Sequence, residues 1–330
     1  MSASSFCKKI IFLSFVIFFF GKLSAFEIFQ FSVAPKYALQ NGQLNEYVVC
    51  PNGHVESELN WPIENISMLG FNATMGWEML LLETDCMWGI PKASGIMLDS
   101  DWVNTSDLGM KTNYSESSNR LETFGNLKLK FGINIKILEF LHIIPYGGLS
   151  YARVKFTANG GTYWYGRPKD TGLSYYVPYN SPEAKTGSFD SYGDVISYEY
   201  ERFNYNLGLK TKYNFLKRFT FSLDISMAVF TQINTLDNHL ISKVDYLDKM
   251  QGWFRCFDFA AEIDVKIWQG LSAGLSGSLL LINRTEGSSY SKNSSETKYS
   301  RTANDMFSGY TVSASSGYTW NVEAFVRYSF

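Results

Sequence analysis

Apolar and polar residues alternate along much of the chain with a period of two. In residues 127–137, the apolar row Leu127, Leu129, Phe131, Ile133, Ile135 and Ile137 alternates with Lys128, Lys130, Gly132, Asn134 and Lys136. Successive side chains of a strand point to opposite faces, so this stretch predicts a strand with one apolar and one polar face. The same alternation recurs at residues 71–81, 203–213, 219–229 and 258–267.

The polar rows of these predicted strands indicate which kind of β-protein they build. They carry charged residues such as Asp224, Glu262 and Lys266. Charged side chains are difficult to place in the core of a soluble sandwich. They suit the wet, hydrogen-bonded interior of a membrane barrel, whose outer face is apolar. We therefore expect the apolar rows to face lipid and the polar rows to face the lumen.

Both ends of the chain agree with a barrel in a bacterial outer membrane. The last residues, 322–330, read V-E-A-F-V-R-Y-S-F and form a closing strand with a terminal Phe330. At the other end, two lysines precede an apolar run at residues 10–20, and small residues end at Ala25. The run is short for a membrane-spanning helix, which needs about 20 apolar residues. It predicts a cleaved signal peptide at residues 1–25 rather than an uncleaved anchor, and a mature barrel at residues 26–330.

Short and long connections alternate between the predicted strands. Short links occur at residues 62–67, 139–142, 214–218 and 268–270, and long or polar stretches occur near 51–53 and at 89–120, 167–194, 236–250 and 291–304. Outer-membrane barrels have short periplasmic turns and long external loops, so the count predicts a ten-stranded antiparallel transmembrane β-barrel. Asn41-Gly42 is either another hairpin turn or a bulge in a long first strand. The predicted strands exceed the roughly 10 residues that cross a membrane, so we expect the barrel to extend above the outer membrane.

Composition supports this fold class and limits the partners. Aromatic residues make up 17% of the chain and charged residues 18%, whereas a soluble domain has about 25% charged residues. The formal charge of −2 gives no reason to expect nucleic-acid binding. Cys50, Cys86 and Cys256 remain in the mature chain, either as three thiols or as one disulfide and one thiol. Their spacing is not that of a metal site, and none is expected.

Two short clusters of ionisable residues begin the long outer stretches. Asp99 and Asp101 are two residues apart, as are Asp237 and His239, so each pair can point to one side of an extended strand. An Asp beside a His orients the imidazole and favours its charged form. With a carboxylate pair opposite to hold water, the set suits amide hydrolysis without a covalent intermediate. The ordinary alternative is solvated acids and an inert histidine in surface loops.

The position of the second cluster on its strand raises a difficulty. Asp237 and His239 share odd numbering with the apolar row at residues 219–229. Unbroken alternation would therefore point both side chains toward lipid. We expect a bulge, or a turn of the chain above the membrane, to re-aim them.

The surroundings of these clusters resemble the omptins, the ten-stranded outer-membrane aspartyl-type proteases of Gram-negative bacteria. The resemblance covers the mature chain and is carried by E-L-N-W at residues 58–61, M-L-D-S-D-W at 97–102, R-V-K-F-T-A-N-G-G at 153–161, D-N-H at 237–239 and R-Y-S-F at 327–330. It implies that Asp99 and Asp101 are the paired carboxylates of an endopeptidase. Asp237 and His239 would be the facing dyad, with His239 accepting a proton from an attacking water.

The resemblance also implies a substrate class and a lipid partner. Omptins seat a basic residue on two acidic groups; Glu46 matches one of them, but Thr235 stands at the second position. We therefore expect cleavage of peptides or proteins near basic residues, with a relaxed or altered preference. Omptins also need lipopolysaccharide, and Arg153 and Arg202 match its basic site outside the barrel. The expected partners beside Arg153 are replaced by Leu149 and Tyr151.

The resemblance thus predicts a monomeric outer-membrane protease that faces the exterior and needs no cofactor other than the activating lipid. Two functions from other classes remain open. A non-enzymatic adhesin or structural barrel of omptin ancestry would suit the aromatic outer stretch at residues 163–165. A general porin fits less well, because side chains fill most of a barrel this small.

Overall fold

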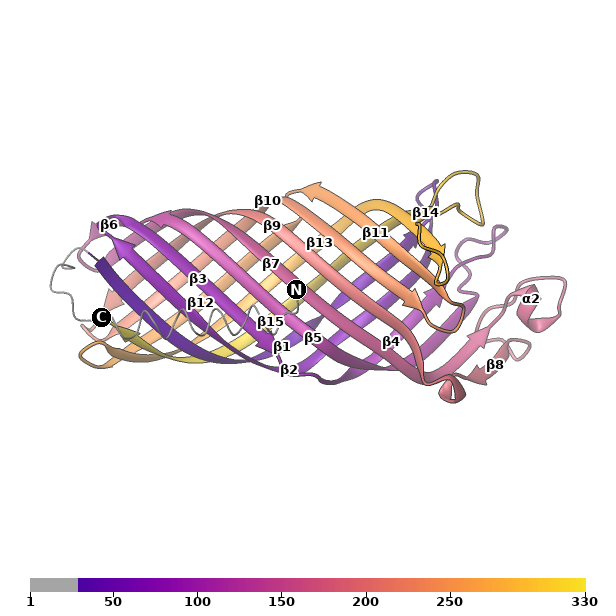
Figure 1. Ribbon diagram of the computed structural model, residues 1–330, viewed down its shortest axis with the longest axis horizontal. Coiled ribbons are helices and arrows are strands. Elements are labelled where there is room, and N and C mark those ends of the chain that lie inside the picture. The colour runs from indigo at the N-terminus through magenta and orange to yellow at the C-terminus, as the bar shows by residue number, and fades with distance from the viewer. Residues whose placement is uncertain (1–28) are drawn as a thin grey trace.

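The computed structural model describes residues 29–330, which form one long closed β-barrel (Figure 1). The predicted signal peptide lies outside the described residues. The strands that run along most of the barrel are β1 (Phe29–Val49), β2 (Val55–Trp77), β5 (Asn113–Ile133), β7 (Leu141–Tyr165), β9 (Asp194–Phe215), β10 (Phe219–His239), β13 (Leu271–Asn293) and β15 (Val312–Ser329). Two further places in the ring are each shared by two strands, β3 (Leu80–Gly89) with β4 (Lys92–Asp101), and β11 (Val244–Trp253) with β12 (Cys256–Trp268).

The remaining elements are short. The strand β6 (Ile135–Leu138) continues β5, while β8 (Lys185–Ser188), β14 (Ser300–Arg301), the helix α2 (Pro168–Thr171) and the 3-10 turn η1 (Asp190–Tyr192) belong to the outer loops. In Figure 1 the long loops gather at one end, where α2 projects furthest. No helix within residues 29–330 is long and apolar enough to cross a membrane.

Pairing of the first and last strands closes the ring. Neighbours along the chain are antiparallel, and β1 pairs with β15 from Ser32 opposite Ser329 to Val49 opposite Val312. The result is a ring of ten strands, which confirms the predicted fold class. The register of β1 against β2 shifts between Gln40 and Gly42, so Asn41-Gly42 forms a bulge and not a hairpin turn.

One predicted turn is wrong. The chain does not turn at residues 62–67, because β2 continues through them and turns at Glu78 and Met79. Pro62 is tolerated inside β2 because the neighbouring ladder is interrupted there: pairing with β4 ends at Asn60, and pairing with β3 begins at Met68. A proline lacks the backbone donor that an unbroken ladder requires. The Ser94 hydroxyl bridges the gap, donating to the Pro62 carbonyl at 2.8 Å.

The inner half of the barrel has an apolar outside and a charged inside. Leu207, Ile225 and Leu275 are exposed on its outer surface, as a lipid-facing belt requires. Inside, Lys210 pairs with Glu83 at 2.9 Å, and Lys130 lies between Glu83 and Asp224, at 3.4 and 2.5 Å. The predicted assignment of apolar rows to the outside and polar rows to the lumen is confirmed for this half.

Toward the loop-bearing end the interior becomes apolar. Trp61 is fully buried and stacks on Tyr198 and Phe156, with ring centroids 5.0 and 5.6 Å apart. These rings belong to a cluster of buried apolar side chains that crosses the barrel interior. We call this cluster the aromatic plug. Its Met68 and Met87 line the charged lumen, and its Leu59 and Met97 line the outer mouth, so the aromatic plug lies between the two.

The outer strands are longer than the sequence indicated. Residues 92–101 and 244–250 fall in stretches that were expected to be loops, but they belong to β4 and β11. The connections beyond them are residues 102–112 and 240–243. Cys50 and Cys256 are buried free thiols, and Cys86 is buried as well.

Candidate active site

A bulge in β10 decides where its outer half points. Ala228 pairs with Asn206 of β9, but Phe230 pairs with Tyr205, so Val229 is an extra residue in the ladder. Before the bulge the even-numbered residues of β10 face inward, and after it the odd-numbered ones do. The bulge predicted from the numbering of Asp237 and His239 is thereby confirmed, and it turns both side chains toward the interior.

Asp237 and His239 make a close contact at the outer end of β10. Asp237 Oδ2 lies 2.6 Å from His239 Nε2, and Asp237 is only 4% exposed. The imidazole also packs edge-on against Tyr246, with ring centroids 5.3 Å apart. A carboxylate bound to one ring nitrogen fixes the orientation of the ring and leaves the other nitrogen, Nδ1, to exchange a proton.

Asp99 and Asp101 lie at the outer end of β4. Asp99 is opposite Leu59 of β2 and Ser115 of β5 in the two neighbouring ladders. Asp101 Oδ2 accepts a hydrogen bond from the Asn113 side chain at 2.8 Å, whereas Asp99 Oδ1 has only a long contact with Ser57, at 3.5 Å. The Asp101 carboxylate is therefore held firmly, whereas the Asp99 carboxylate keeps acceptor capacity for another partner.

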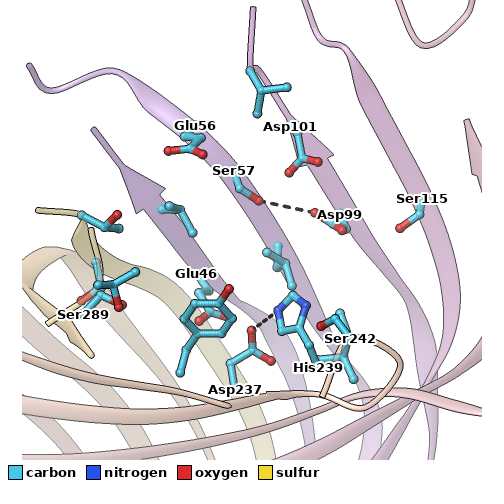
Figure 2. A pocket seen from close by; sticks show the side chains of 18 of the residues that line it. Glu46, Glu56, Ser57, Asp99, Asp101, Ser115, Asp237, His239, Ser242 and Ser289 are labelled. Atoms are coloured by element: carbon cyan, nitrogen blue, oxygen red, sulfur yellow. Dashed lines mark hydrogen bonds and ion pairs between the residues drawn. The ribbon is translucent and has the colours of Figure 1, made fainter. Parts of the chain in front are cut away.

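All four residues line one cavity of about 420 Å³ at the outer mouth. Figure 2 shows Asp237 and His239 on one wall and Asp99 with Asp101 on the strands opposite. The structure thus brings together residues that the sequence separates widely. The cavity also contains Glu46, which the sequence placed in a substrate pocket.

The charges of the cavity alter one another's proton affinity. The site lies in the outer half of the barrel, beyond the lipid-facing belt. Burial opposes the charge on His239, but the nearby Asp237, Asp99 and Asp101 outweigh it and raise the pKa of His239 to about 9. Burial and repulsion from Asp101 raise the pKa of Asp99 to about 8. Such displaced values are common where acids and bases do chemistry.

A second group of carboxylates lies deeper in the same cavity. Glu46 on β1 and Asp248 on β11 are each 5% exposed. Burial, Asp237 and Asp248 raise the pKa of Glu46 well above its usual range. Burial and Asp237 raise the pKa of Asp248 to about 7. Thr235 stands at the position where the resemblance to omptins led us to expect a second acidic residue. It is buried, and its hydroxyl donates a hydrogen bond to Asp248 at 3.3 Å.

Sequence reasoning missed Asp248 because residues 236–250 were interpreted as a loop. In a strand, Tyr246, Asp248 and Met250 would have formed one row with period two. The structure confirms that row in β11, where Asp248 and Met250 are both buried. The detectable signal was therefore the alternation itself, not any motif.

The two arginines assigned to a lipid site lie on opposite faces of the barrel wall. Arg153 is on the outer face with its side chain 49% exposed, and it pairs with Glu199 at 2.5 Å and lies 3.6 Å from Glu201. Arg202 is only 5% exposed and faces the interior. The expectation that Arg202 binds a lipid phosphate outside the barrel is wrong, because alternation along β9 turns it inward.

These features define the class of protein: a closed outer-membrane β-barrel whose mouth holds a cavity with buried ionisable groups. A model of the Omptin family matches residues 29–315. The chain therefore belongs to the omptin family.

Solved structures agree with the fold. The outer membrane protease OmpT from Escherichia coli superimposes with a TM-score of 0.75 at 17% sequence identity, covering 94% of this chain and 99% of that one. The translocator domain of the autotransporter NalP from Neisseria meningitidis has a TM-score of 0.35 at 8% identity, covering 99% of this chain and 96% of that one. The second similarity is too low to carry any argument. Among curated protein sequences, none matches this chain.

Proposed function

We propose that this protein is an outer-membrane endopeptidase of the aspartyl type. The observation that carries the proposal is the Asp237–His239 contact of 2.6 Å in a cavity that also holds Asp99 and Asp101. A fixed base facing a carboxylate with free acceptor capacity provides two anchors for one water molecule. Membership of the omptin family supports the same assignment.

In the proposed mechanism the water lies between His239 Nδ1 and Asp99. His239 removes one proton as the water oxygen attacks the scissile carbonyl carbon, and Asp237 stabilises the imidazolium that forms. When the tetrahedral intermediate collapses, the C–N bond breaks and His239 returns the proton to the leaving amine. The products are a carboxylic acid and an amine. Asp101, held by Asn113, lies beside Asp99, and repulsion between the two carboxylates raises the affinity of Asp99 for a proton.

The proposed substrates are peptides or exposed protein segments with a basic residue at the cut. Residues of the outer loops, including Arg167, Ser242 and Asp305, line the cavity. The long loops gather at one end of the barrel (Figure 1), so the site would face the cell exterior in the usual orientation of outer-membrane barrels. Glu46 supplies a buried carboxyl group in the same cavity as the dyad, and this group can ionise and pair with a cationic side chain that enters the cavity.

We also propose that lipopolysaccharide activates the enzyme through the outer face near Arg153. Arg153 and Lys155 on β7 are opposite Glu201 and Glu199 on β9, so one phosphate would have to compete with Glu199 for the guanidinium of Arg153. A monomer is the expected state, because closure by β1 and β15 leaves no long edge strand to pair with another chain.

The test is cleavage of a peptide library by the refolded protein, with and without lipopolysaccharide. His239→Ala should abolish cleavage while the barrel keeps its heat-modifiable migration on gels. His142→Ala is the matched control, because His142 lies near the inner turn and contacts Asn134 instead of the cavity. Equal cleavage by wild type and His239→Ala would overturn the mechanism. No cleavage by folded protein under any lipid condition would favour the adhesin.

A further inference from the structure

Asp248 lies where a second acidic group could replace the one that Thr235 lacks. Asp248 on β11 is directly opposite Thr235 on β10, two residues before Asp237. Its side chain lines the same cavity as the dyad. The acidic residue absent from position 235 of β10 is therefore present on the neighbouring strand, at the paired position.

Two buried carboxyl oxygens of this pocket, Glu46 Oε2 and Asp248 Oδ1, make no hydrogen bond of ordinary length with any residue within 29–330. The side chains of Trp61 and Ser313 lie close enough to these acids to interact with them only weakly. The other oxygen of Asp248 is occupied by the Thr235 hydroxyl. Ionised carboxyl groups buried this close together are strongly unfavourable without a positive charge beside them. A cationic side chain in the cavity would supply that charge and would allow both acids to ionise.

The surrounding wall leaves space for a long side chain. Between β11 and β1 the wall is formed by small residues, with Ser289 opposite Asp248 and Ser315 opposite Glu46.

We propose that Asp248 and Glu46 together seat the basic side chain of the substrate, so that Asp248 takes over the role of the missing acid at Thr235. The inference rests on the proposed endopeptidase function and specifies its substrate pocket. Thr235 becomes a positioning residue, because its hydroxyl holds Asp248 Oδ2 and leaves Oδ1 for the ligand. The expected consequence is strong selection for arginine instead of the relaxed preference that a single anion would give.

Binding to a cleavage-deficient protein tests the pocket without depending on catalysis. His239→Ala protein, purified in detergent with lipopolysaccharide, would be titrated with two peptides that differ only in arginine or citrulline. Citrulline keeps the shape of arginine but has no charge. Charge-assisted hydrogen bonds predict a preference of about ten- to a hundredfold for the arginine peptide. Asp248→Asn should remove most of that preference.

Two further variants separate a specific effect from general damage. Restoring an acid on β10 by Thr235→Asp in the Asp248→Asn background should recover the preference for arginine. Asp245→Asn is the matched control on the same strand, because Asp245 pairs with Lys292 at 3.2 Å and does not line the cavity. It should leave the preference unchanged.

The outcomes for the two proposals can be told apart. Heat-modifiable migration shows whether the Asp248→Asn protein is folded. If the folded variant prefers the arginine peptide over the citrulline peptide as strongly as the protein that keeps Asp248, the proposed role of Asp248 is overturned. If Thr235→Asp does not restore the preference for arginine in the Asp248→Asn background, although Asp245→Asn keeps that preference, Asp248 has only a structural role and the proposal also fails. Absence of cleavage by wild-type protein that nevertheless prefers the arginine peptide would refute the endopeptidase and support the pocket.

Discussion

His239 Nε2 lies 2.6 Å from Asp237 Oδ2 inside the barrel. Both residues have odd numbers, and the odd-numbered residues in the inner half of the same strand face lipid. The extra residue at Val229 in β10 reverses the alternation and makes this contact possible. One inserted residue thus converts a lipid-facing row into a row that faces the site. Four predictions follow from this arrangement and its surroundings.

Deletion of Asn234, which lies between the bulge and the dyad, should abolish proteolysis while leaving a folded barrel. Loss of one paired residue there reverses the alternation of the residues that follow and turns Asp237 and His239 outward. Deletion of Val229 should retain cleavage, because Val229 is the unpaired extra residue, and Ala228 and Phe230 keep their partners and faces without it. Peptide cleavage measures the loss, and heat-modifiable migration on gels measures folding. A barrel lacking Asn234 that still cleaves at the wild-type rate would show that alternation along β10 is not what positions the dyad. Deletion of Leu240, in the turn after β10, is a control that leaves the parity of the strand intact.

The pH dependence of kcat/KM should report the charge on His239. Its pKa is raised to about 9, so the neutral form that accepts a proton increases as pH rises toward that value. The acidic limb of the profile should therefore lie well above the ordinary histidine value of about 6.5. Asp99→Asn should shift this limb to lower pH, because it removes a negative charge that stabilises the imidazolium.

The control for this shift is Asp107→Asn in the loop at residues 102–112, where the carboxylate binds the backbone of Gly109. That variant should keep the wild-type limb. A wild-type limb at or below pH 6.5, or one that does not move in Asp99→Asn, would contradict the assigned electrostatics.

Trp61→Ala should destabilise the barrel by about 3–5 kcal/mol, the usual effect of deleting a buried aromatic side chain. Trp61 is fully buried between Tyr198 and Phe156, so its removal leaves a cavity in the aromatic plug. The midpoint of urea unfolding, followed by gel migration, measures the change. Trp320→Ala is the comparison, because Trp320 is exposed on the outer surface and should matter much less. Equal effects of the two substitutions would show that the plug does not stabilise the barrel.

Activation by lipopolysaccharide should depend on Arg153 and not on Arg202. Arg153 is exposed on the outer face, whereas Arg202 is enclosed in the interior. Arg153→Ala should raise the lipid concentration needed for half-maximal activity. Arg202→Met should leave that concentration unchanged, whatever it does to stability. An Arg153→Ala protein with wild-type lipid dependence would locate the lipid site elsewhere.

The sequence predicted the local features of the barrel well where alternation was regular. The ten-stranded antiparallel fold was predicted correctly, and the numbering of Asp237 and His239 predicted a bulge or a turn of the chain before them, of which the structure contains the bulge. It failed at Pro62, where a proline and polar neighbours suggested a turn. The strand continues there because β3 and β4 leave a gap in the neighbouring ladder, and a break in a neighbour cannot be seen from the local sequence.

Alternation by itself determined which side chains share a face of a strand, because the period of two is a local property of the extended backbone. Only the tertiary structure decided which faces meet. Closure of the ring brings Asp99 on β4 across from His239 on β10, and the register of β10 with β11 sets Asp248 beside Thr235. These contacts join strands distant in the chain or depend on their exact pairing. No local pattern encodes that information, because it arises from the packing of the whole barrel.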